Sequence, residues 1–157
     1  MHLNADVAGL ESLPLRLMIV AVVASMSVVP AARMLDTLED KEFVDRAKLQ
    51  LENIVAAAQL LSVEGPGGVR TLSLDFSGRG ELRFRSLVLG GESGSANMSS
   101  VQLLLSSGSR ILRTATAPEV WLVSPEGAAL EVSSPVFELR LSAMLAEGQL
   151  RVQAEAS

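Results

Sequence analysis

Residues Leu17-Met-Ile-Val-Ala-Val-Val-Ala-Ser-Met-Ser-Val-Val-Pro-Ala-Ala32 carry no charged side chain, and Arg16 and Arg33 flank them. A helix formed by this run is apolar on every side. Sixteen helical residues rise about 24 Å, whereas the hydrocarbon core of a bilayer is ~30 Å thick. Counting from Ser12 lengthens the apolar segment, because Arg16 can extend its charged head to the interface. We therefore expect a membrane-spanning helix at about residues 12–32, with a buried core helix as the alternative.

The helix is expected to continue past Arg33 with a different character. Residues 33–63 place apolar side chains at alternating steps of three and four, the spacing of one helical stripe. The members of this stripe are Val44, Ala47, Leu51, Ile54, Ala58 and Leu61. Pro30 has no backbone N–H to donate and crowds the preceding turn, which predicts a kink. The sequence Glu64-Gly-Pro-Gly-Gly68 ends the helix. One long kinked helix at residues 10–63 follows, with a leader at residues 1–9.

From Val69 the hydrophobic period changes to two, which is typical of strands. Short alternating runs separated by Gly and Pro turns continue to the end of the chain and favour an antiparallel sandwich. The alternation breaks near Ser86, which predicts a bulge or a strand end there. The predicted fold class is therefore α+β, a long apolar helix followed by an antiparallel all-β sandwich-like head at residues 69–157.

The helix should dock on this head through its apolar stripe. Leu51 and Ile54 lie on the stripe, and we expect them to pack on the sheet through Leu72, Leu74 and Phe84.

Composition excludes several classes of function. The net charge is −5, whereas a nucleic-acid-binding face requires clustered Lys and Arg. Cysteine is absent, so disulfides, thiolate metal sites and thiol nucleophiles are excluded. Aromatic residues make up 3% of the chain, which argues against base-stacking platforms and sugar-stacking clefts. His2 is the single histidine and lies in the predicted leader, so we expect no serine triad. We predict no enzyme activity, no cofactor, and no catalytic or metal-binding residues.

Two short segments invite a functional interpretation. Residues 90–96, Gly-Gly-Glu-Ser-Gly-Ser-Ala, are rich in glycine but lack the Lys and helix start of a phosphate-binding loop, so we interpret them as a flexible hairpin loop. Asn97-Met-Ser99 matches the acceptor pattern for N-glycosylation. Asn97 is the candidate residue, and chance occurrence is the alternative.

The run Leu15-Arg-Leu-Met-Ile-Val-Ala-Val-Val-Ala-Ser25, followed by a long helix and a β-rich head, resembles the class III leader and N-terminal helix of archaeal type IV pilins and archaellins. The resemblance implies cleavage by a prepilin peptidase between Gly9 and Leu10, and filament assembly by a pilus machinery through the N-terminal helices. Two features depart from the family. The leader carries Asp6 where relatives carry Lys or Arg, and most basic residues follow the apolar run, which the positive-inside rule places in the cytoplasm.

The favoured function is a structural subunit of an archaeal type IV pilus-like extracellular filament. It is a homo-oligomer through its N-terminal helices, located in the cell membrane as a single-pass protein or on the cell surface as a filament. The alternative is a single-pass membrane-anchored β-sandwich binding module that does not polymerise, similar to the stator components of archaella or to proteins that contact the surface layer. The N-terminus of the native protein distinguishes the two, because cleavage after Gly9 favours the filament and an intact leader favours the anchor.

Overall fold

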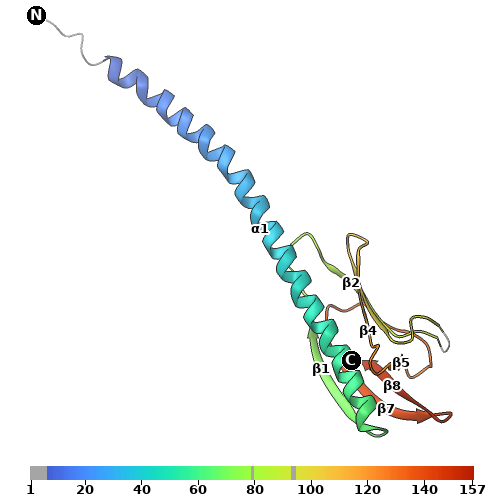
Figure 1. Ribbon diagram of the computed structural model, residues 1–157. Coiled ribbons are helices and arrows are strands. Elements are labelled where there is room, and N and C mark those ends of the chain that lie inside the picture. Colours follow the sequence, from blue (N-terminus) through green and yellow to red (C-terminus); the bar gives the residue numbers. More distant parts are fainter. Residues whose placement is uncertain (1–6, 79, 93–94) are drawn as a thin grey trace, which may run out of the picture. The chain divides into compact units, whose positions relative to one another are not determined.

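The computed structural model describes the backbone of residues 7–78, 80–92 and 95–157, and their side chains except those of residues 7–14, 27 and 29–32. The chain divides into two compact units, Met1–Leu38 and Glu39–Ser157. A single helix, α1 (Val7–Glu64), belongs to both units (Figure 1). Gly65 follows its last residue with a φ of 91°, a left-handed conformation that suits glycine and ends the helix.

The predicted membrane span is wrong. In the part of the chain that the structure describes, no helix is long and apolar enough to cross a membrane. The physical reason is length, because the uncharged run between Arg16 and Arg33 rises only about 24 Å as a helix, short of the ~30 Å hydrocarbon core. The predicted transmembrane helix at residues 12–32, the single-pass membrane localisation and the membrane-anchored binding module are all corrected by this finding.

Eight strands follow α1 and form two four-stranded sheets. The first sheet has the order β1-β7-β8-β5, and the second has the order β4-β3-β2-β6. The strands are β1 (Val69–Asp75), β2 (Phe84–Leu89), β3 (Ser100–Leu105), β4 (Arg110–Thr114), β5 (Trp121–Val123), β6 (Leu130–Val132), β7 (Val136–Ala146) and β8 (Gln149–Ala156).

The antiparallel prediction is also wrong in one pairing. β5 runs parallel to β8, with Trp121 opposite Arg151, so the first sheet is mixed. β5 and β8 are far apart in sequence, and no hairpin turn dictates their relative direction, so alternation alone could not reveal the pairing. The irregularity predicted near Ser86 is confirmed, because the register between β2 and β3 shifts between Phe84 and Ser86.

The core of the second unit lies between the two sheets and the C-terminal part of α1. Leu51 and Ile54 are completely buried, and Leu74 is 2% exposed. Leu72 and Phe84 are partly buried against the same cluster. The expected helix-on-sheet packing of these five residues is therefore confirmed.

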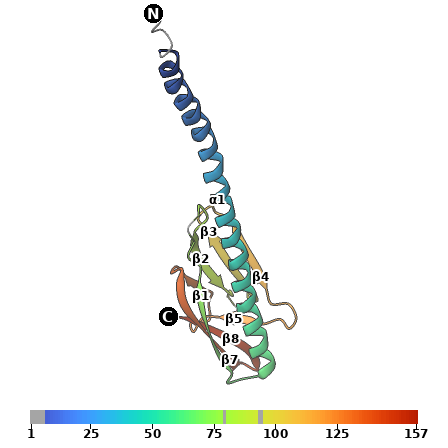
Figure 2. The same cartoon turned by 90° about the vertical axis from the view of Figure 1, so that its left-hand side faces the viewer.

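Polar contacts attach α1 to an edge strand of each sheet. Beside β1, Gln50 bonds the backbone of Asp75, and Arg46 donates to Ser77 O at 2.9 Å. Beside β4, Arg113 pairs with Glu52 at 3.2 Å. Figure 2 shows β1 and β4 on either side of this part of α1. The helix thus satisfies backbone groups at the edge of β1 and is tied to β4 by an ion pair.

Candidate assembly surface

The described side chains of the first unit expose an unusual amount of apolar surface. Between residues 15 and 28 the large apolar side chains are each 46% to 72% exposed, and they are Leu15, Leu17, Met18, Ile19, Val20, Val22, Val23, Met26 and Val28. Burying one such side chain fully is worth roughly 1.5–3 kcal/mol. Exposed apolar patches of this kind on natural proteins mark interaction sites.

The serine whose side chain is described within this run does not oppose helix packing. Ser25 donates its hydroxyl to the backbone oxygen of Val22 at 2.8 Å, so its hydrogen bond is made within the helix. Further along the first unit, Thr37 does the same with Arg33 O at 2.8 Å. A shallow hollow of about 300 Å³ lies here, lined by Arg33, Thr37, Met34 and Leu38. A neighbouring apolar side chain fits such a hollow without leaving a serine or threonine unbonded.

In the second unit α1 carries a second apolar stripe, which we call the outer stripe: Leu49, Ala56, Leu60 and Val63. Leu49, Leu60 and Val63 are 58%, 50% and 75% exposed. At 100° per residue these positions lie opposite Leu51 and Ile54, which face the core. The outer stripe therefore remains uncovered after the head has folded.

Charges of both signs border the outer stripe. Helical spacing places Lys48 and Glu52 on one side of it and Arg46 on the other. Lys48 approaches Asp45 at 3.7 Å, and both side chains are exposed, so this surface pair contributes little to stability.

The structure places the sequence-predicted site residues as follows. Gly9, Leu10 and Pro30 lie within α1, and their side chains fall outside those described, so the cleavage site and the kink stay predictions. Asn97 is exposed in the turn before β3, and its backbone oxygen accepts from Ser100. An exposed turn is compatible with glycan attachment, which also stays a prediction.

The glycine-rich segment is better packed than expected where it begins. Gly90 and Gly91 are buried, and Gly90 N donates to Ser100 O at 2.8 Å. The first two residues of the segment are therefore part of the head's packing, while Ser93 and Gly94 lie outside the described residues.

The described part of the chain has few clusters of titratable side chains. Among the described residues no group of three or more His, Cys, Asp or Glu side chains is arranged to hold a metal ion. Hydrogen bonds from the hydroxyl and the backbone N–H of Ser77, with Arg46 nearby, lower the pKa of Asp75 against a small opposing effect of burial. Because Ser77 N lies 2.8 Å from Asp75 Oδ1, this arrangement is a local turn that precedes Gly78.

The outer stripe is the functional feature that sequence reasoning missed. The steps from 49 to 56, 60 and 63 are helical, so the signal was present, but the stronger core stripe obscured it.

No family model, curated protein or solved structure matches this chain.

Proposed function

We propose that this chain is a structural subunit that assembles with copies of itself through α1 into a type IV pilus-like filament. The observation that carries the proposal is the set of nine large apolar side chains between residues 15 and 28, all at least 46% exposed. Helices bury such surfaces against one another by interdigitating their side chains. A second copy supplies a surface of the same composition.

The two exposed apolar surfaces of α1 support an open assembly. A filament requires a contact in which two different faces meet, so that each copy leaves a free face for the next. The apolar surface at residues 15–28 and the outer stripe are two such faces. The role is structural rather than catalytic, and the resemblance to pilins implies a processing peptidase and an assembly machinery as further partners.

The test is Val20→Glu, expressed in the native host and compared with the unaltered protein at equal abundance by immunoblot. Val20 is 64% exposed, so the folded head should not change, whereas a carboxylate buried between helices is strongly unfavourable. We expect sedimentation and negative-stain microscopy to show filaments of the unaltered protein and none of Val20→Glu. The control is Leu112→Glu on β4, at an exposed leucine outside α1.

Two results contradict the proposal. One is an unaltered protein that stays monomeric at every concentration tested. The other is a Val20→Glu protein that forms filaments as well as Leu112→Glu does.

A further inference from the structure

The only tryptophan of the chain lines a small cavity at one edge of the first sheet. Trp121 begins β5, which is the last strand of that sheet. The cavity has a volume of about 200 Å³ and is lined by Glu119, Trp121, Gln149 and Leu150. These residues come from the segment before β5, from β5 and from the start of β8, so the cavity depends on the tertiary fold.

The indole ring is held in place by a cation. Because β5 is parallel to β8, Trp121 lies opposite Arg151, and the guanidinium carbon lies 5.9 Å from the ring centroid. Glu147 holds this guanidinium through a contact of 3.1 Å between Oε2 and Arg151 Nη2. A cation over an aromatic face is attracted to the ring and restrains it.

The turn that carries Glu147 has a strained backbone conformation. Glu147 has a φ of 52° and Gly148 a φ of 78°, so the two-residue turn between β7 and β8 requires left-handed conformations at both positions. For a residue with a side chain this conformation is sterically unfavourable. Glycine or asparagine at position 147 would adopt the left-handed conformation at a lower cost in free energy, but neither could reach the Arg151 guanidinium. Strained residues of this kind concentrate at functional sites.

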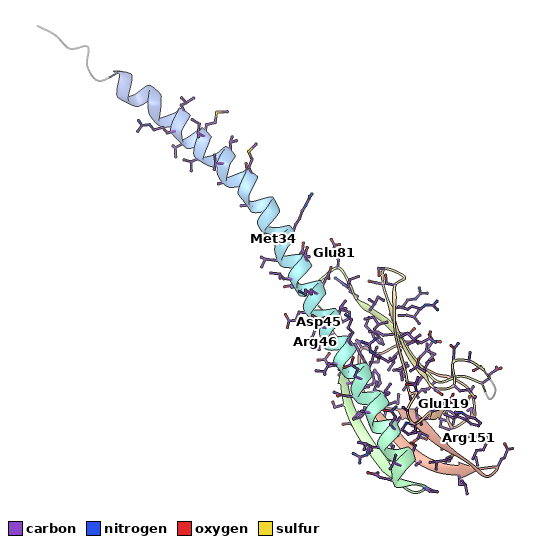
Figure 3. The ribbon with its side chains drawn as sticks, in the orientation of Figure 1. Met34, Asp45, Arg46, Glu81, Glu119 and Arg151 are labelled. Atoms are coloured by element: carbon purple, nitrogen blue, oxygen red, sulfur yellow. The ribbon has the colours of Figure 1, made fainter. Side chains whose placement is uncertain are left out.

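A hydrogen bond also fixes the position of the Glu119 carboxylate. Ser99, which is 4% exposed, donates its hydroxyl to Glu119 Oε1 at 3.2 Å. A bridge between Thr116 and Glu119 closes the loop before β5. Figure 3 labels Glu119 and Arg151, which both lie at this end of the head.

We infer that this cavity binds one neutral sugar ring, which lies against the side of Trp121 that Arg151 does not cover and whose hydroxyl groups bond Glu119 and Gln149. An indole presents a flat apolar surface, a carboxylate accepts two or more hydrogen bonds, and a carboxamide both donates and accepts. The volume is below the ~300 Å³ at which pockets for larger ligands begin, which suits a single ring. Glu119 and Glu147 outnumber Arg151, so a phosphate or carboxylate ligand is disfavoured. The composition argument against a sugar cleft fails here, because one well-placed tryptophan is sufficient.

The inference is independent of filament assembly, and it is tested on the purified full-length protein. Trp121 is the only tryptophan, so its fluorescence reports this cavity alone. The probes are D-glucose, D-galactose and N-acetyl-D-glucosamine, then maltose, lactose and chitobiose, which carry the same sugars at a chain end. Glycerol serves as the control for bulk solvent effects. Tighter binding of a disaccharide than of its monosaccharide identifies a glycan end as the ligand, and equal binding identifies the free sugar.

We expect at least one sugar to change the fluorescence saturably. Glu119→Gln and Gln149→Ala should each weaken the binding of that sugar about tenfold or more. Glu119→Gln removes hydrogen bonds to a charged carboxylate, and Gln149→Ala removes those to a carboxamide. Both side chains are exposed, so neither substitution threatens the fold. Glu126→Gln, an exposed residue of the turn after β5, is the matched control and should bind normally. The inference is overturned by the absence of a saturable change with every sugar, or by a change that both cavity substitutions leave intact.

Discussion

Gln50 and Asp75 are joined by two hydrogen bonds between a helix side chain and a strand backbone. Gln50 Nε2 donates to Asp75 O at 2.7 Å, and Asp75 N donates to Gln50 Oε1 at 3.1 Å. A primary amide has the donor and acceptor spacing of a peptide group, so Gln50 occupies the edge of β1 as a neighbouring strand would. This edge satisfaction explains why α1 stays fixed beside β1 without a strand pairing there.

Gln50→Ala should therefore destabilise the head by about 1–2 kcal/mol, because two backbone groups lose their partners at a partly solvated edge. Urea denaturation followed by circular dichroism measures the change. Gln59→Ala is the matched control, since Gln59 makes one long bond of 3.4 Å to Pro118 O. Equal losses at positions 50 and 59 would show that the paired geometry has no special weight.

Two substitutions, at positions two residues apart on α1, test how this helix packs on the sheets. Leu51→Asp buries an unpaired carboxylate in the core and should cost on the order of 4 kcal/mol or unfold the head. Leu49→Asp changes a side chain that is 58% exposed and should stay within about 0.5 kcal/mol of the unaltered protein. Thermal denaturation of both full-length variants gives the comparison. A Leu51→Asp protein as stable as Leu49→Asp would mean that the helix does not pack on the sheets through this stripe.

Periodicity predicted the elements of this fold better than their pairing. The change to a period of two at Val69 coincides with the start of β1, and the three-and-four spacing of Leu51 and Ile54 identified the buried face of α1. Phe43 was missed, because it lies among charged residues and outside the predicted stripe, yet it is 2% exposed and belongs to the core. A single aromatic among charges gives no periodic signal, and the loop at Gly78 packs on it.

The parallel pairing and the cavity were beyond sequence reasoning for a related reason. Trp121 and Arg151 are 30 positions apart in the sequence, and their proximity depends on the order in which strands join the first sheet. The predicted membrane span was wrong because the apolar run is too short. Hydropathy identifies a helix as apolar but does not show whether lipid or protein covers it.

Asp75 predicts a dependence of stability on pH. Its pKa is lowered chiefly by the hydrogen bond from the Ser77 hydroxyl and then by the Ser77 backbone N–H. A lowered pKa in the folded state contributes stability above the unfolded-state value of about 3.9, and this stability is lost as the pH falls through the folded value. The gap in melting temperature between the unaltered protein and Asp75→Asn should therefore be present near neutral pH and close as the pH falls through the folded-state pKa. Ser77→Ala should raise the pKa of Asp75 in an NMR titration, and an unchanged pKa would contradict the assignment.

The outer stripe predicts a variant that folds normally and assembles poorly. Leu60 is 50% exposed, so Leu60→Glu should change the free energy of unfolding by no more than about 0.5 kcal/mol. In an assembly that buries the stripe the same carboxylate loses its water, and filaments should become fewer at equal protein level. Normal filaments from Leu60→Glu, with none from Val20→Glu, would confine the contact to the first unit.

Gly90 predicts the largest effect of any glycine whose surroundings are described. Its φ is 69°, and an added Cβ would overlap the carbonyl oxygen of Leu122. That carbonyl cannot retreat easily, because Leu122 is completely buried and lies in β5, opposite Val152 of β8. Gly90→Ala should therefore cost about 3 kcal/mol or more, from overpacking and the left-handed conformation together. Gly108→Ala is the control, since Gly108 has a φ of 82° but open space around it, and it should lose only about 1–2 kcal/mol. If urea denaturation gave the same loss at both positions, backbone strain alone would account for Gly90, and its packing on β5 would be dispensable.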